Sequence, residues 1–251
     1  MLLNYPRLLF LLSFFVLWLS AQVGASLRKQ RPLKDEERED FGIVQAATLT
    51  LLALIIGFSY SMAIERYDQR KNYEEAEANA IGTEYVRADL LPASDAARVH
   101  LLLREYLDQR ILFYRTRDEE ELGPINARTA QLQSEMWSGV KAPASAQPTP
   151  VLALVVVGMN DVLNSQGYTQ AAWWNRIPHS AWSLMAASAI CCTLLVGYSA
   201  RRHNAGVIQL VLPLVLSIAF FLIADIESPR RGIIRVVPQN LVSLSKSLPS
   251  Q

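Results

Sequence analysis

The chain has 251 residues, of which 51% are hydrophobic, and its 24 basic residues nearly balance its 23 acidic ones. The formal net charge of +1 argues against a nucleic-acid partner, because phosphate binding needs an excess of Lys and Arg on one face. The apolar residues come in long blocks, with a mean hydropathy of +0.16, which predicts a polytopic membrane protein. Two adjacent cysteines, Cys191 and Cys192, lie inside one such block, where they can form neither a disulfide framework nor a spaced zinc site.

The N-terminal region, residues 1–27, contains an apolar run over residues 8–25 with Arg7 before it. Two interpretations compete. The run is long enough for a first transmembrane helix, but the small residues at 23–25 also have the form of a signal-peptidase site. We favour a retained first helix, and both interpretations place the N-terminus in the cytoplasm. Residues 28–40 follow as a charged loop, which is too polar to enter lipid and too short to fold alone.

Residues 41–92 predict one long helix that begins in the membrane and continues beyond it. Residues 41–63 are largely apolar and carry no charge, and at about 1.5 Å per residue they can cross a hydrocarbon core of roughly 30 Å. Charges begin at Glu65, and no proline interrupts the sequence before Pro92. We therefore expect a second transmembrane helix whose continuation carries a helical extramembrane domain over residues 64–177.

Helix boundaries can be predicted within this domain. Ser94 and Asp95 are N-cap candidates for an amphipathic helix, and the Leu-Gly-Pro sequence at 122–124 is expected to end it. A further helix is expected over residues 125–140.

Residues 142–150, rich in proline and alanine, are expected to form a linker. Thr149 and Pro150 should open the next helix, with threonine as the N-cap and proline at the first helical position. Near the end of that helix, Trp173 and Trp174 are assigned to the headgroup level of the membrane, with ordinary core packing as the alternative.

Residues 178–200 and 206–226 predict the third and fourth transmembrane helices, joined by a tight turn at 201–204 as an antiparallel hairpin. The C-terminal tail, residues 227–251, is expected to run along the surface. The predicted fold class is all-α, with four transmembrane helices in two pairs and the helical domain between the second and the third.

Several stretches, GFSYSMAIERYDQR, EAEANAIGTEYVRADLLP, REYLDQRILFY and IADIESPRRGIIRVVPQ, resemble the bacterial bestrophin-like family, whose function is unknown. The resemblance runs from about residue 41 to the tail. It implies a distant relation to true bestrophins, which are pentameric chloride-selective channels with four spans and a cytosolic helical domain between the second and third. True bestrophins carry an acidic calcium clasp after the last span. This chain has Ser-Pro-Arg-Arg at 228–231 instead, so calcium gating is not expected.

The second transmembrane helix has two faces of interest. One stripe is polar at its ends and apolar in the middle, and it is a candidate pore lining with a constriction that gates by dewetting, unless it is a buried or lipid-facing side. A second stripe of small residues is assigned to helix packing or subunit contacts, because small residues let helices approach closely. The candidate pore-lining residues are Gln45, Thr48, Leu52, Ile56 and Ser59, and the small-residue stripe is Ala46, Thr50, Ala53, Gly57 and Ser61.

Polar residues just beyond the membrane form two further candidate groups. The first lies on the continuation of the long helix and either binds an ion or a neighbouring subunit or, as we favour, holds this helix against the other helices of the domain. The second is basic and suits anionic lipid headgroups. The first group is Glu77, Asn79, Thr83 and Arg87, and the second is Arg230, Arg231 and Arg235.

No catalytic, cofactor or metal site is expected. The sequence lacks a glycine-rich phosphate loop, and its three histidines are far apart in the chain. The acidic run at 118–121 has no glycine-kinked loop of alternating oxygen ligands, so it does not predict a calcium site.

Together these features predict a non-enzymatic, multi-pass protein of the bacterial inner membrane that contacts the lipid bilayer and forms a homo-oligomer. The leading hypothesis is a bestrophin-like pore for a small inorganic anion. The alternative is a non-conducting scaffold or sensor whose helical domain binds a cytosolic partner. Basic residues flank both sides of the spans almost equally, so our placement of the helical domain in the cytoplasm rests mainly on the N-terminal segment.

Overall fold

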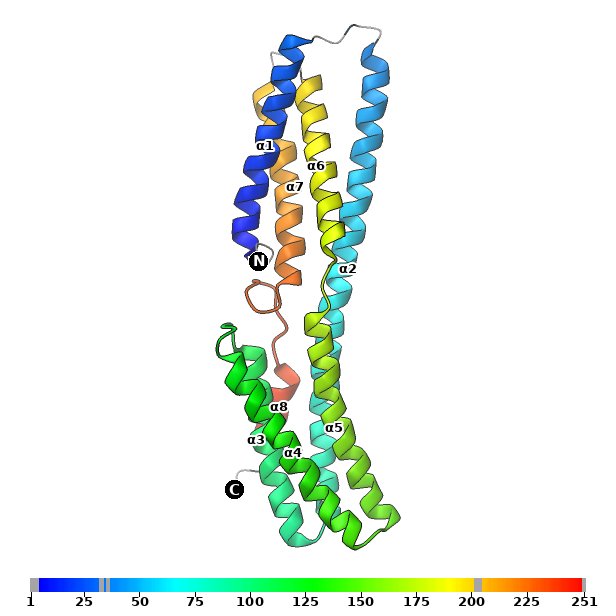
Figure 1. Ribbon diagram of the computed structural model, residues 1–251, viewed down its shortest axis with the longest axis vertical. Coiled ribbons are helices and arrows are strands. Elements are labelled where there is room, and N and C mark those ends of the chain that lie inside the picture. Colours follow the sequence, from blue (N-terminus) through cyan, green and yellow to red (C-terminus); the bar gives the residue numbers. More distant parts are fainter. Residues whose placement is uncertain (1–4, 32–33, 35–36, 201–204, 250–251) are drawn as a thin grey trace. The chain divides into compact units, whose positions relative to one another are not determined.

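The computed structural model describes residues 5–31, 34, 37–200 and 205–249, and this part of the chain is helical without a β-strand (Figure 1). Among the described residues, four helical segments are long and apolar enough to cross a membrane. The predicted all-α class with four candidate spans is therefore confirmed. The turn predicted at 201–204 lies outside the described residues.

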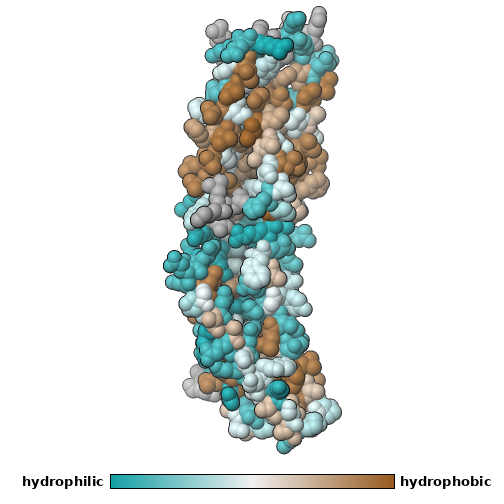
Figure 2. Space-filling view, in the orientation of Figure 1, coloured by the Kyte–Doolittle hydropathy of each residue, from teal (hydrophilic) through white to brown (hydrophobic). Residues whose placement is uncertain are grey.

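The chain forms two compact units. The membrane unit consists of Met1–Arg66 and Arg176–Arg235, and the helical unit consists of Tyr67–Asn175 and Val236–Gln251. The membrane unit exposes many large hydrophobic side chains, and the face of it seen in Figure 2 is predominantly hydrophobic. This is the surface expected of helices that face lipid.

Helix α1 (Pro6–Gln30) packs on α6 (His179–Ser199) at very short range. A Cβ atom placed on Gly197 would lie 2.0 Å from the backbone oxygen of Ala21, and one placed on Gly24 would lie 2.1 Å from that of Leu194. The guanidinium of Arg28 donates to the carbonyl oxygens that end α6, including Ala200 O at 2.7 Å. Arg28 lies in the predicted charged loop but belongs to α1, because its charge suits the negative end of α6.

Helix α2 (Glu37–Arg87) is continuous over 51 residues and contributes to both units. Glu37, Glu39 and Asp40 lie in its first turn, where negative charge is favoured by the helix dipole. A short 3-10 helix, η2 (Ala88–Leu90), follows before Pro92. The prediction of a helix that runs on beyond its apolar segment is confirmed. The last membrane-unit helix is α7 (Ala205–Glu227).

In the helical unit, the second part of α2 packs with α3 (Ala93–Arg115), α4 (Leu122–Ala146), α5 (Pro150–Trp174) and α8 (Gln239–Ser247). The core is made of apolar side chains at helical spacing along each of these helices. Fully buried members include Ile81, Leu103, Tyr106, Leu107, Leu132, Met136, Val155, Met159 and Leu241.

Three predicted boundaries in this unit are wrong. The N-cap of α3 is Pro92, and neither Ser94 nor Asp95 caps it. The sequence at 122–124 opens α4 and does not end α3, because proline is tolerated in the first turn of a helix, where the N–H groups have no intrahelical partner. The predicted linker at 142–150 is mostly helical, since α4 continues to Ala146.

The predicted start of α5 is confirmed. The side chain of Thr149 accepts a hydrogen bond from Leu152 N at 3.2 Å, and proline occupies the first helical position. At the other end of α5, Trp173 is buried in the core of the helical unit while Trp174 is 74% exposed. The core-packing alternative therefore describes Trp173.

The tail does not simply run along a surface. Val236 and Leu241 are buried in the core of the helical unit. The carboxylate of Glu74 on α2 accepts hydrogen bonds from Leu241 N at 2.9 Å and Asn240 Nδ2 at 2.7 Å, so it caps the N-terminus of α8. A capping group this far away in sequence leaves no local signal in the tail itself.

Candidate functional site

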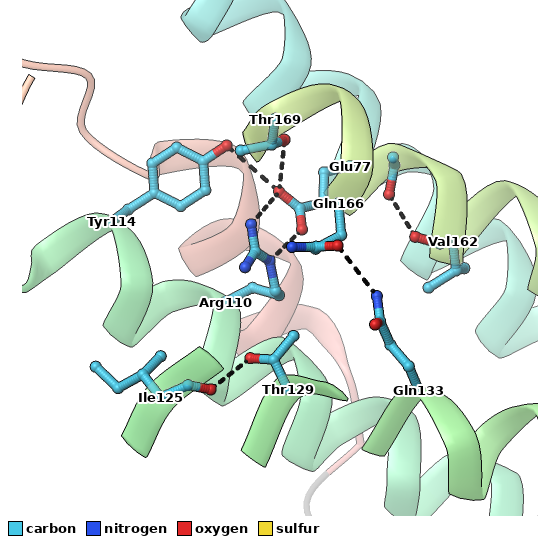
Figure 3. Close-up of polar contacts among 10 residues, drawn as sticks. Glu77, Arg110, Tyr114, Ile125, Thr129, Gln133, Val162, Gln166 and Thr169 are labelled. Carbon is cyan, nitrogen blue, oxygen red and sulfur yellow. Dashed lines mark hydrogen bonds and ion pairs between the residues drawn. The ribbon is translucent and has the colours of Figure 1, made fainter. Parts of the chain in front are cut away.

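The polar residues of α2 that were predicted to lie just beyond the membrane occupy two different sides of this helix. Glu77 points into the helical unit, where its carboxylate pairs with the guanidinium of Arg110 on α3 (Figure 3). Tyr114 Oη donates to the same carboxylate at 3.3 Å, and Thr169 Oγ1 on α5 donates at 3.2 Å. Glu77 thus ties α2 to two other helices.

Helical spacing explains this arrangement. Arg110 and Tyr114 are four residues apart and therefore lie on one face of α3. Burial, together with the charge of Glu77, raises the pKa of Tyr114 above its ordinary value, so the phenol keeps the proton that it donates. With both charged side chains fully buried, the pair is a structural anchor, since an unpaired charge there would be very costly.

Asn79 and Thr83 lie on the opposite side of α2 and are exposed. With Arg87 they line a groove of about 640 Å³, whose other wall is α8. Asn240, Ser243 and Ser247 are among the residues of that wall. The four candidates that the sequence grouped together therefore do not form a single cluster.

Glu84 is a candidate residue that we did not predict from the sequence. This residue is 0% exposed, and neither of its carboxyl oxygens has a hydrogen-bond partner in the described part of the chain. It faces Gly158 on α5, where a Cβ atom would stand 2.0 Å from Glu84 Oε2 and 2.6 Å from Arg87 Nη1. A signal was available, because Glu84 follows Glu77 by two helical turns and shares the face that carries Ile81.

In the membrane unit, the two predicted stripes of α2 lie on different sides. Leu52 and Ser59 are buried within the chain, while Gln45, Thr48 and Ile56 are half-buried. The small-residue stripe is exposed along its whole length, at Ala46, Thr50, Ala53, Gly57 and Ser61. A Cβ atom on Gly57 would meet nothing within 4 Å. The stripe assigned to packing is thus open in a single chain.

The three arginines after α7 belong to the membrane unit. Arg231 is exposed and lies over the ring of Tyr5, with Cζ 4.5 Å from the ring centroid. Arg230 and Arg235 are half-buried. Their segment is fixed by the carboxylate of Asp225, which accepts hydrogen bonds from the backbone N–H groups of residues 233 and 234 at 2.8 to 2.9 Å. Over the described residues, no three His, Cys, Asp or Glu side chains are grouped so as to hold a metal ion.

Comparisons with known proteins identify relatives of this architecture. The sequence model of the Bestrophin-like domain matches residues 8–241. A crystal structure of a bacterial bestrophin homologue from Klebsiella pneumoniae, carrying a tryptophan-to-alanine mutation, matches with a TM-score of 0.65 at 14% identity, over 95% of this chain and 97% of that chain. Another structure of a bacterial bestrophin homologue from Klebsiella pneumoniae, phased with zinc, gives a TM-score of 0.63 at 15% identity, over 97% and 99% of the two chains. No curated protein matches the chain.

Proposed function

Because this chain belongs to the Bestrophin-like family, we propose that it assembles into a homo-oligomeric pore that conducts small inorganic anions. The pore is proposed to lie in the bacterial inner membrane, with the helical unit in the cytoplasm. The basic residues Arg230, Arg231 and Arg235 are proposed to contact anionic lipid headgroups.

One observation carries the proposal. The apolar segment of α2 is almost uncovered in a single chain, with 6% of its most apolar window buried, against 50% for the corresponding window of α7. The uncovered side bears the small-residue stripe, which allows close approach of another helix. We propose that further copies of α2, and not lipid alone, cover this side.

Within such an assembly we assign the pore wall to the exposed side of α2. Leu52 and Ser59, from the stripe first predicted to line a pore, are buried within the chain and cannot reach a central axis without rearrangement. Leu54 and Phe58 are exposed, lie four residues apart and flank the small-residue stripe. They are candidates for a hydrophobic constriction that gates by dewetting.

Chloride flux into liposomes that contain the purified protein tests this proposal. We expect flux above that of empty liposomes, and we expect Phe58→Ala to raise it by widening the constriction. Phe15→Ala is the matched control, since Phe15 on α1 is also an exposed phenylalanine of the membrane unit, and it should leave the flux unchanged. Monomeric protein without flux would leave the alternative, a scaffold or sensor that binds a cytosolic partner.

A further inference from the structure

We propose that Glu84 is a proton-binding site between α2 and α5, at the notch that Gly158 leaves in the surface of α5. The site holds a proton at neutral pH, and loss of the proton loosens the packing of these two helices. The proposal deepens the proposed function, because it adds a regulatory site to a helix that also spans the membrane. Its test is nevertheless independent of conduction.

The geometry of the notch suits a neutral carboxyl group. Glu84 is fully buried, and its two oxygens lack hydrogen-bond partners in the described chain. The ends of two side chains occupy the space over Gly158, where a Cβ atom would lie 2.0 Å from Glu84 Oε2 and 2.6 Å from Arg87 Nη1. A buried carboxylate in such a place would be an unsolvated charge, whereas the protonated form carries none.

The charges around the notch are Arg87 on α2 and Asp161 on α5. Burial raises the pKa of Glu84 from its ordinary 4.5 to about 8, Arg87 lowers it and Asp161 raises it. Arg87 is close enough to act on Glu84 but does not neutralise it. Glu84 therefore stays protonated at pH 7 and ionises as the pH passes through about 8.

The sign of the effect follows from linkage. Between pH 4.5 and about 8 the folded state holds a proton that the unfolded state has released, so the free energy of unfolding falls as the pH rises through this window. Above pH 8 both states are ionised at this group, and its contribution no longer changes. Because the ionised carboxylate is fully buried and has no hydrogen-bond donor in the described chain, it draws in water, and the α2–α5 contact at Gly158 loosens to admit that water.

The experiment uses the full-length protein in detergent between pH 6 and pH 9.5. Infrared difference spectra should show the carbonyl band of one protonated carboxyl group disappearing with a midpoint near pH 8. Hydrogen exchange, corrected for its intrinsic pH dependence, should rise over the same interval in the α5 residues around Gly158. Glu84→Gln, which mimics the protonated form, should abolish both changes, while Glu75→Gln, at an exposed glutamate of the same helix, should retain them.

Two results would overturn the proposal. One is an infrared band that is absent at pH 7 or unchanged in Glu84→Gln. The other is an exchange rise that persists in Glu84→Gln. Chloride flux measured at pH 7 and pH 9 separates this inference from the proposed function: if no variant conducts while the spectroscopic changes remain, the pore proposal fails and the proton site stands.

Discussion

Glu77 shows how a single carboxylate can organise a helical unit. Its oxygens pair with the guanidinium of Arg110 and accept hydrogen bonds from the hydroxyl groups of Tyr114 and Thr169. Residues from α2, α3 and α5 therefore meet at one charge. Buried ion pairs contribute little net stability compared with apolar packing, but removing one partner leaves an uncompensated charge. The network therefore fixes how α2, α3 and α5 pack together.

Arg110→Ala tests this anchor. We expect the change to lower the free energy of unfolding by about 3 to 5 kcal/mol, because Glu77 then stays buried without its cation. Arg128→Ala is the control, since the pair between Arg128 and Glu105 is partly exposed and screened by solvent, so its loss should lower the free energy of unfolding far less. Denaturant titration of both variants in detergent gives the comparison, and equal losses would contradict the assignment.

At the residue scale, helical periodicity predicts which side of α2 a residue occupies but not what it meets there. Glu77 was recognised as a candidate, but the partner that buries it, Arg110, lies on another helix and is set by tertiary packing. Helical spacing places Glu84 on the face that carries Glu77 and Ile81, but it does not predict whether that glutamate has a partner. Only the structure shows that it faces Gly158 without a partner.

At the scale of elements, the starts of α3 and α5 depend on a few local contacts. The sequence predicted the start of α5 correctly because threonine followed by proline is a strong N-terminal signal. The predicted start of α3 was wrong, because Pro92 occupies the N-cap position and Ser94 lies within the first turn. The long α2 was predictable because no proline occurs between its charged start and Pro92.

The capping difference can be measured. Thr149→Ala should destabilise the protein by about 1 kcal/mol, because it removes the acceptor for Leu152 N. Ser94→Ala, at the position wrongly predicted to cap α3, should have little effect, since no side-chain cap forms there. Thermal unfolding followed by circular dichroism ranks the two, and a larger loss in Ser94→Ala would contradict these helix starts.

The contact between α1 and α6 gives a second prediction at this scale. Gly197→Ala should disrupt it strongly, because even a Cβ atom would lie 2.0 Å from a backbone oxygen of α1. Gly42→Ala on α2 is the matched control, since a Cβ there meets nothing within 4 Å and alanine has the higher helix propensity. The melting temperatures of the two variants in detergent give the comparison. Equal stability would mean that α1 is not packed on α6 in the mature protein, as cleavage of a signal peptide would produce.

At the scale of the whole molecule, the small-residue stripe on α2 is the proposed contact between copies of the chain. The room around Gly57 means that Gly57→Leu should leave the fold of a single chain intact. The same change should break a homo-oligomer, because a large side chain would separate helices that approach through small residues. Size-exclusion chromatography with light scattering measures the mass, and an unchanged mass would remove this stripe from the proposed contact.

Electron imaging of the purified, unmutated protein in detergent shows whether its chains assemble around α2. We expect closed rings of identical copies, with the exposed side of α2, from Ala46 to Ser61, nearest the symmetry axis. Single copies, or rings in which detergent or lipid covers that side of α2, would contradict it.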